Sequence, residues 1–264
     1  MSSGMYTLIT GATGHLGKSF CHACARRGEN LYLTGRSEEK LAALAAELQT
    51  TYGVAVEYGP CLLHEESSRS VFFQQAENRG VQFSKLLNVA GADVQKSFEK
   101  YTQEKLIFQV RANFEAAVDF TRFFLSHRMD EGAILTVASV NGLYSMPYFA
   151  LYSATKGAEI QFFSALREEL RDKNVKVTTV LPGAMPTRED VKEQIKGQGL
   201  WGKLAAKSTD FVAEKSLTAL QKNKRIYIPG FWNRALQGAM KLVPVSLKIR
   251  LIAKRWKKIE KDAF

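Results

Sequence analysis

Short apolar runs alternate with longer amphipathic stretches along most of the chain. The runs have the length of buried strands, and the stretches between them repeat their apolar positions every three or four residues, as helices do. Strands are predicted near residues 5–10, 30–34, 53–59, 84–89, 132–138, 175–181 and 224–228. Helices are predicted near residues 15–28, 37–50, 65–79, 103–128, 151–173 and 208–222. This alternation predicts an α/β fold with one doubly wound parallel sheet of about seven strands and helices on both faces, whose ligand binds at the carboxyl ends of the strands.

Length and composition are those of one globular domain. The chain has 264 residues, of which 45% are apolar, enough to enclose a large core. We expect residues 1–230 to form this domain and residues 231–264 to form a basic amphipathic extension. Cys21 and Cys24 fall on one predicted helix, so they cannot anchor a disulfide framework, and no second ligand pair follows them at a zinc-like distance. With no long apolar run preceded by positive charge at the N-terminus, we expect a cytoplasmic protein without a metal.

The positive charge is concentrated at the C-terminal end. The formal net charge is +11, and residues 222–264 contain twelve Lys or Arg against Glu260 and Asp262. The first 221 residues are therefore nearly neutral, which disfavours a nucleic-acid surface over the body of the protein. We expect no nucleic-acid partner.

The basic extension has the pattern of an amphipathic helix. Its lysines and arginines lie off a stripe whose members recur at steps of three and four residues: Leu242, Val245, Ile249, Ile252, Trp256 and Ile259. A basic amphipathic helix is typical of attachment to an anionic membrane surface, which would make the protein peripheral to the membrane. Ordinary surface helices show the same stripe, so docking on the protein body or on a partner subunit is the alternative.

The loop after the first strand has the glycine spacing of a phosphate-binding turn. Glycines there allow a tight turn and a close approach of the backbone to a pyrophosphate, while the following helix presents free N–H groups to the anion. This strand, loop and helix predict a Rossmann-type dinucleotide site. The residues assigned to it in this loop are Gly11, Thr13, Gly14, His15, Leu16 and Gly17.

The end of the second strand indicates which dinucleotide is bound. An acidic residue there would hold the ribose 2′-hydroxyl of NAD, but the sequence has Arg36 followed by Ser37. A guanidinium can donate two hydrogen bonds to a 2′-phosphate, and the serine can add another while it caps the next helix. The pair favours NADP(H), and the alternative is a solvated arginine beside a helix cap.

Tyr152 and Lys156 lie four residues apart on a predicted helix, so their side chains share one face. A phenol titrates near 10, and a neighbouring ammonium favours its ionised form, which suits acid–base work near neutral pH. Ser139 follows the fifth predicted strand at its carboxyl end, where its hydroxyl can hold a substrate carbonyl. These three residues predict a carbonyl–alcohol redox site.

Together these motifs resemble the short-chain dehydrogenase/reductase family over roughly residues 5–230. The resemblance implies a dinucleotide-binding catalytic domain. Its glycine loop, its Asn-Asn-Ala-Gly element, its active-site quartet and its Pro-Gly after the sixth strand all occur in the expected order. The matched positions are Gly11, Gly14 and Gly17; Asn88, Val89, Ala90 and Gly91; Asn113, Ser139, Tyr152 and Lys156; and Pro182 and Gly183, with Thr187 close after them.

The resemblance implies an NADP(H)-dependent carbonyl reductase, similar to 3-oxoacyl reductases. Tyr152 would protonate the carbonyl oxygen while Ser139 orients the substrate, and Lys156 would bind the nicotinamide ribose and lower the pKa of Tyr152. Asn113 would hold a water of the proton relay, or else be a polar residue on a solvent-facing helix surface. The remaining residues assigned to the cofactor are Leu62, Asn88, Ala90, Gly91, Pro182, Gly183 and Thr187.

Two positions depart from the family pattern. Cys61 stands where an Asp usually meets the adenine, and Val89 replaces the second Asn of the Asn-Asn-Ala-Gly element. The first departure removes the acidic residue that usually meets the adenine, and the second removes one polar side chain while the backbone turn can still form.

The substrate side of the predicted site is apolar. Residues 140–149 form a loop rich in large apolar groups, which suits a 3-oxoacyl chain or an oxosteroid, or alternatively serves loop packing or a subunit contact. Residues 187–207 fall where the family carries a substrate lid. The resemblance also suggests a homodimer or homotetramer formed through the helices near 103–128 and 151–173. Two other functions stay open: an epimerase or dehydratase with the same Tyr-Lys chemistry, and a catalytically silent NADP-binding regulator or scaffold recruited through the basic tail.

Overall fold

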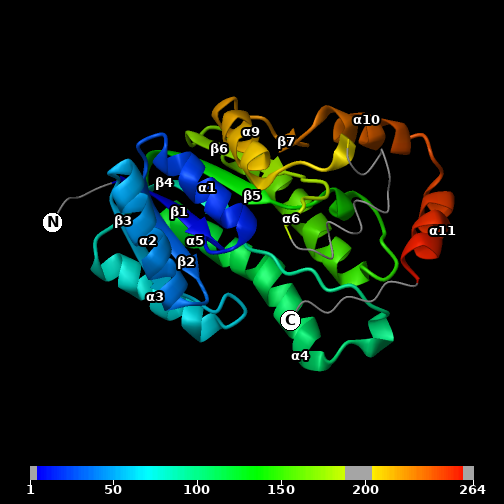
Figure 1. The fold of residues 1–264 in the computed structure, drawn as a ribbon, viewed down its shortest axis with the longest axis horizontal. Coiled ribbons are helices and arrows are strands. Elements are labelled where there is room, and N and C mark those ends of the chain that lie inside the picture. Colours follow the sequence, from blue (N-terminus) through cyan, green and yellow to red (C-terminus); the bar gives the residue numbers. More distant parts are fainter. Residues whose placement is uncertain (1–4, 188–203, 258–264) are drawn as a thin grey trace.

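The computed structural model describes residues 5–187 and 204–257, and within them seven parallel strands form one sheet (Figure 1). The order is β3-β2-β1-β4-β5-β6-β7, so the predicted doubly wound α/β fold is confirmed. Every strand pair is parallel, as crossover helices between successive strands require. The strands are β1 (Met5–Thr10), β2 (Asn30–Gly35), β3 (Val56–Pro60), β4 (Gln82–Asn88), β5 (Arg128–Val137), β6 (Val175–Val180) and β7 (Ile226–Tyr227).

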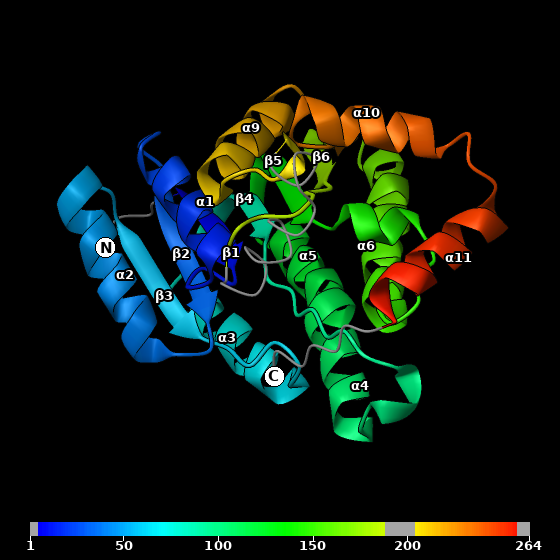
Figure 2. The same ribbon diagram turned by 45° about the vertical axis from the view of Figure 1, so that its right-hand side comes forward.

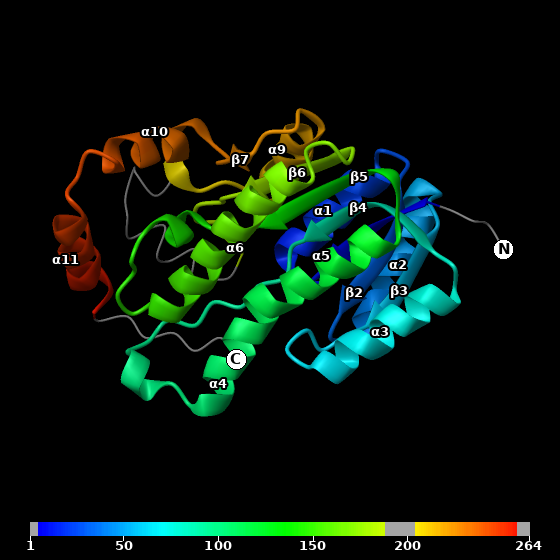
Figure 3. The same ribbon diagram turned by 180° about the vertical axis from the view of Figure 1, so that it is seen from behind.

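Helices cover both faces of the sheet (Figures 2 and 3). One apolar cluster joins α1, α2 and α9 to the sheet, and a second joins α3, α5 and α6 to the opposite face. The central strands are almost fully buried because helices cover them from both faces, whereas the edge strands β3 and β7 are only partly buried. The helices are α1 (His15–Ala25), α2 (Glu38–Tyr52), α3 (Glu66–Asn78), α4 (Gln103–Val110), α5 (Ala116–Ser126), α6 (Ala150–Glu169), α9 (Thr209–Gln221), α10 (Phe231–Met240) and α11 (Val245–Trp256).

The strand order reverses between β1 and β4, and the two loops that leave these strands therefore separate toward opposite faces. At their start the loops are held together, since the Thr10 hydroxyl accepts hydrogen bonds from the backbone N–H groups of Val89 and Ala90 at 3.1 and 3.3 Å. A crevice at such a reversal is the usual ligand site of an open parallel sheet.

The helix predicted near residues 103–128 is confirmed over Gln103–Ser126, but its hydrogen-bond pattern is not α-helical throughout. Between α4 and α5 lies a π-helical segment, Arg111–Glu115, which includes Asn113, and the helix ends at Ser126 before β5 begins. A π segment inserts one residue into the helical repeat and is often found at functional sites. Here it brings the side chain of Asn113 to the loop after β4.

The extension after β7 forms two helices joined by a turn rather than one. Pro244 stands at the N-cap of α11, so Leu242 lies between the helices and is 88% exposed. Of the predicted stripe, Ile249, Ile252 and Trp256 are half-buried, Val245 is exposed, and Ile259 lies outside the described residues. Among the described helices, none is both long and apolar enough to cross a bilayer.

Candidate active site

A cleft of about 730 Å³ opens at the carboxyl ends of the central strands. It is large enough for a nucleotide cofactor and a small substrate side by side. Its walls bring together the glycine loop, the end of β2, the loop after β4 and the start of α6. The predicted site residues that line it are Gly11, Thr13, Gly14, His15, Leu16, Gly17, Arg36, Ala90, Gly91, Ser139, Tyr152, Lys156, Pro182, Gly183 and Thr187.

The glycine loop leaves the N-terminus of α1 open to the cleft. Gly14 is the N-cap residue and makes no side-chain capping bond, so the first N–H groups of the helix face the cleft without a side-chain partner. A side chain at Gly17 would place its Cβ 2.0 Å from the Gly11 oxygen, and one at Gly11, where φ is +67°, would lie 2.8 Å from the Ala90 Cα. This close-packed turn fits the pyrophosphate of a dinucleotide.

The mouth of the cleft beyond β2 is basic. Arg36 and Lys40 line it, whereas Ser37 does not, because its hydroxyl caps α2 by accepting the Lys40 backbone N–H at 3.3 Å. The sequence reasoning missed Lys40, although its position four residues after Arg36 and in the first turn of α2 is a recognisable signal. Two basic side chains at this edge suit a phosphate on the adenosine ribose.

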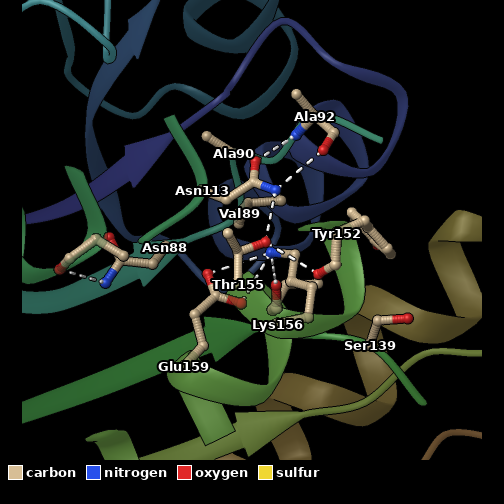
Figure 4. A network of polar contacts seen from close by, with 12 residues as sticks. Asn88, Val89, Ala90, Ala92, Asn113, Ser139, Tyr152, Thr155, Lys156 and Glu159 are labelled. Atoms are coloured by element: carbon tan, nitrogen blue, oxygen red, sulfur yellow. Dashed lines mark hydrogen bonds and ion pairs between the residues drawn. The ribbon is translucent and has the colours of Figure 1, made fainter. Parts of the chain in front are cut away.

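The two asparagines of the predicted site brace its backbone rather than line the cleft. The Asn88 amide donates to the Thr121 hydroxyl at 3.2 Å and to the Ala117 carbonyl. The Asn113 oxygen accepts the Ala92 backbone N–H at 2.7 Å, and its amide donates to the Ala92 carbonyl at 3.0 Å and to the Thr155 hydroxyl at 3.1 Å (Figure 4). Asn113 thereby joins the loop after β4 to helix α6, and both of its amide hydrogens are used.

Tyr152 and Ser139 face each other across the floor of the cleft. Ser139 follows β5 and Tyr152 stands in the first turn of α6, as the sequence predicts. Burial, together with the negative charges of Asp93 and Glu159, raises the pKa of Tyr152 well above its usual value, and hydrogen bonding with Ser139 lowers it. The phenol is therefore protonated and can act as a proton donor. Asp93 also lines the cleft and was missed by the sequence reasoning.

Lys156 is anchored beneath the cleft. Its ammonium donates to the Val137 carbonyl at 2.9 Å and lies 2.9 Å from a carboxylate oxygen of Glu159 (Figure 4). A Cβ on Gly91 would sit 3.1 Å from the ammonium nitrogen, so the glycine is what allows the loop after β4 to approach it.

The contact between the loop after Ser139 and helix α6 is equally close. Gly142 lies in the short 3-10 helix Val140–Leu143, where a Cβ would meet the Lys156 carbonyl carbon at 2.7 Å and the Gly157 nitrogen at 2.8 Å. This backbone contact positions Ser139 relative to Tyr152. The sequence reasoning did not assign Gly142 a role, and a lone glycine in a loop carries no signal for one.

The apolar side of the cleft includes the C-terminal extension. The rings of Phe149 and Trp256 meet edge to face at 5.4 Å, and both line the cleft with Met185. Tyr144 donates a hydrogen bond to Gln237 of α10, which ties the apolar loop of residues 140–149 to the extension. The lid expected over residues 187–207 falls mostly on residues 188–203, which lie outside the described residues.

The remaining predicted positions are less directly involved. Leu62 does not line the cleft, although its neighbours Cys61 and Leu63 do, and Cys61 stands where the family pattern has an Asp. Burial raises the pKa of the Cys61 thiol to about 11, so at neutral pH it meets a ligand as an uncharged group. Within residues 5–187 and 204–257, no three His, Cys, Asp or Glu side chains lie close enough together to hold a metal ion.

A family model described as short chain dehydrogenase matches residues 6–196. Among the relatives, 11-beta-hydroxysteroid dehydrogenase-like 4A of Arabidopsis thaliana is 28% identical over 239 residues, covering 89% of this chain and 79% of that protein. Very-long-chain 3-oxoacyl-CoA reductase of Bos taurus is 30% identical over 198 residues, covering 70% of this chain and 61% of that protein.

Solved structures of similar proteins share the fold of this chain. One, described as giving insights into 7beta-hydroxysteroid dehydrogenase stereoselectivity, has a TM-score of 0.85 and 25% identity, covering 95% of this chain and 97% of that one. A short-chain dehydrogenase from Sphingobium yanoikuyae in complex with NADPH has a TM-score of 0.75 and 25% identity, covering 98% and 97%. The second structure shows a nicotinamide cofactor bound to a protein of this fold.

Proposed function

Because this chain belongs to the short-chain dehydrogenase/reductase family and is an oxidoreductase of carbonyl and alcohol substrates, we propose that it reduces an apolar carbonyl compound with NADPH. The observation that carries the proposal is the meeting of Ser139, Tyr152 and Lys156 in the same cleft as the open N-terminus of α1. One wall can therefore hold a cofactor and the other can hold a carbonyl group.

Ser139, Tyr152 and Lys156 have different roles in the proposed reduction. Bound NADPH supplies hydride to the carbonyl carbon. Ser139 donates a hydrogen bond to the carbonyl oxygen, and the protonated phenol of Tyr152 transfers its proton to that oxygen as the alcohol forms. Lys156 holds the nicotinamide ribose and favours the phenolate left on Tyr152, since a nearby positive charge stabilises it. In the reverse direction, Tyr152 accepts the proton from the alcohol.

The basic mouth of the cleft supports NADPH over NADH. Arg36 and Lys40 line this edge. Among the described residues that line the cleft, the only acidic one is Asp93, which lies on the loop after β4. A 2′-phosphate is attracted by the two cations, whereas the 2′-hydroxyl of NADH makes no charged contact with them.

An apolar substrate fits the opposite wall. Phe149, Met185 and Trp256 line the same cleft as Tyr152 with ring and thioether surfaces. The relatives described above are named as an 11-beta-hydroxysteroid dehydrogenase-like protein and a very-long-chain 3-oxoacyl-CoA reductase. We infer that the substrate is a 3-oxoacyl chain or an oxosteroid. Assembly into a homodimer or homotetramer stays a prediction, which sedimentation or light scattering can measure.

The outer face of the extension supports binding to an anionic membrane. Residues 215–257 contain no Asp or Glu. Basic residues of α10 and α11 accompany large apolar side chains that are exposed, and a second copy would bring like charges together. The exposed apolar residues are Phe231, Trp232, Leu236, Leu242, Val245, Leu247 and Leu251. Each basic residue near an anionic surface contributes about 1 kcal/mol, and apolar side chains add a term that salt does not screen.

Vesicle co-sedimentation tests the membrane proposal. We expect the full chain to bind anionic vesicles at low salt, and a chain ending near Lys241 to bind them much less while keeping its fold. Neutral vesicles are the lipid control, and the circular dichroism spectrum of the shortened chain checks its fold. Failure of the full chain to bind anionic vesicles at low salt contradicts the proposal and favours docking on protein.

A panel of substrates tests the activity itself. Purified protein with NADPH is offered 3-oxoacyl thioesters, oxosteroids and small ketones, and the loss of nicotinamide absorbance is followed. Tyr152→Phe should abolish turnover while leaving NADPH affinity within a few-fold, because the hydroxyl transfers the proton but contributes little to cofactor binding. A Tyr152→Phe protein with near wild-type turnover would show that the assigned proton donor is wrong. NADPH binding with no turnover on any substrate would favour the silent regulator.

A further inference from the structure

A carboxylate is buried directly behind the site lysine. Glu159 lies on α6 one turn beyond Lys156, and the two side chains are 1% and 3% exposed. The Lys156 ammonium is 2.9 Å from one Glu159 oxygen and 3.2 Å from the other (Figure 4). Within the described part of the chain, Glu159 and Lys156 therefore form a buried ion pair, whose ammonium also donates to the Val137 carbonyl.

Packing alone does not require an acid at this position. The neighbouring buried residues of the same helix, Ile160 and Phe163, are apolar and belong to the clusters that join α6 to the sheet. Burying a carboxylate has a large desolvation cost that an ion pair offsets only partly. An apolar side chain would avoid this cost but would leave the buried Lys156 ammonium without a counter-ion, so the charge of Glu159 acts on Lys156.

We propose that Glu159 is a positioning residue that holds Lys156 and sets how strongly its positive charge favours the phenolate of Tyr152. An ammonium paired with a carboxylate acts at a distance as a dipole, whose field is weaker than that of a lone cation. The ionised Glu159 therefore weakens the stabilisation that Lys156 gives to the phenolate of Tyr152. The inference rests on the proposed reductase function.

The charges around the pair agree with this role. Glu159 and Asp93 both raise the pKa of Tyr152, the first from α6 and the second from the loop after β4. On the sheet side, the pair meets the uncharged Val137 carbonyl of β5. Burial raises the pKa of Glu159 to about 7, against the opposing effect of Lys156. The pair can thus lose its negative member near neutral pH and leave Lys156 as the net charge facing Tyr152.

The pH profile of alcohol oxidation with NADP⁺ tests the proposal. Tyr152 must be ionised to accept the proton, so kcat rises with pH through an apparent pKa of this residue. Residues 152 and 159 are two helical turns apart, which is about 10 Å. Removing the negative charge of Glu159 should therefore shift the rising limb of the pH profile, where kcat increases with pH, to lower pH by about one unit. Glu159→Gln keeps the shape of the side chain without the charge, and we expect it to show this shift.

Controls separate charge from packing. Glu159→Asp keeps the charge, so its kcat should rise at a pH closer to that of the wild-type protein. Glu159→Leu removes the charge, so its kcat should rise at lower pH, as in Glu159→Gln. Glu168→Gln removes an exposed carboxylate from the same helix, so it should leave the limb unchanged. If Glu159→Gln lowers kcat equally at every pH without moving the limb, the residue is merely structural and the proposal is overturned.

The unfolding temperature without cofactor gives a second readout that needs no substrate. A carboxyl whose pKa is raised in the folded state binds a proton more tightly than in the unfolded chain, so its contribution to stability is present at low pH and lost as pH rises through about 7. Relative to Glu159→Gln, the wild-type protein should lose about 5 °C between pH 5 and pH 9. If the difference in unfolding temperature between the wild-type protein and Glu159→Gln is the same at pH 5 and pH 9, the proposal is overturned. If the difference changes with pH but no substrate is turned over, only the reductase function is contradicted.

Discussion

Replacing Gly142 by Ala should strongly lower the activity of the enzyme without changing a reacting group. The new Cβ would lie 2.7 Å from the Lys156 carbonyl carbon, about 0.8 Å closer than the shortest favourable carbon–carbon separation of about 3.5 Å. The neighbouring atoms are helix backbone, which cannot move aside as a side chain can. The loop carrying Ser139 and the helix carrying Tyr152 must therefore separate.

The expected magnitudes follow from that displacement. A misplacement of about 1 Å can reduce catalysis about 100-fold, so kcat should fall between about tenfold and 100-fold. Overpacking costs about 1–3 kcal/mol, which in a protein of this size lowers the unfolding temperature by roughly 2–10 °C. Both are measured on the purified variant, kcat with the best substrate of the panel and unfolding by calorimetry.

Two other glycines provide a graded comparison. Gly157→Ala adds its Cβ on the other side of the same contact, 3.2 Å from the Gly142 oxygen, and should have a smaller effect. Gly238→Ala lies in α10 with no atom within 4 Å of the new Cβ, and should be neutral or slightly stabilising because alanine favours a helix. If Gly142→Ala keeps kcat within twofold and unfolds at the wild-type temperature, the argument that this contact positions the site is wrong.

Two further predictions concern the ends of the cleft. Arg36→Ala should weaken NADPH binding about ten- to 100-fold and leave NADH binding almost unchanged, because a charge-assisted bond to phosphate is worth about 1.5–3 kcal/mol. Fluorescence titration measures both affinities, and a wild-type preference for NADH would remove the basis of the prediction. Trp256→Ala should raise KM for bulky apolar substrates several-fold more than KM for small ketones, since Trp256 lines the substrate wall beside Phe149. An equal change for both classes would place the ring outside the substrate contact.

Local patterns were sufficient to predict the sheet and the crossover helices, and to bring Tyr152 and Lys156 to one cleft. Gly14 and Gly17 follow a strand and open a helix, and Tyr152 and Lys156 share a helical face, so sequence spacing alone brings each pair together. The motif order then joined these local features into one family pattern.

Features that depend on contacts between distant segments could not be predicted. The π segment around Asn113 forms where its side chain meets Ala92, twenty-one residues away, and the helical period does not reveal this. The position of Trp256 depends on the turn between α10 and α11, and the need for glycine at position 142 depends on a backbone contact with α6. Glu159 had a local signal, since it lies three residues after Lys156, but burial was needed to give it meaning.

The edge-to-face contact between Phe149 and Trp256 brings the C-terminal extension into the apolar wall of the cleft. Binding of the nucleotide and binding of the substrate are thereby assigned to different parts of the chain. The wall proposed to hold the nucleotide is built mainly by residues 11–93, whereas the apolar wall is formed by Phe149, Met185 and Trp256. Substitutions in α10 and α11 can therefore change which carbonyl compound is accepted while the nucleotide wall stays the same. In such an arrangement, substrate range can change through the C-terminal helices, at a position remote in sequence from the glycine loop proposed to hold the phosphates.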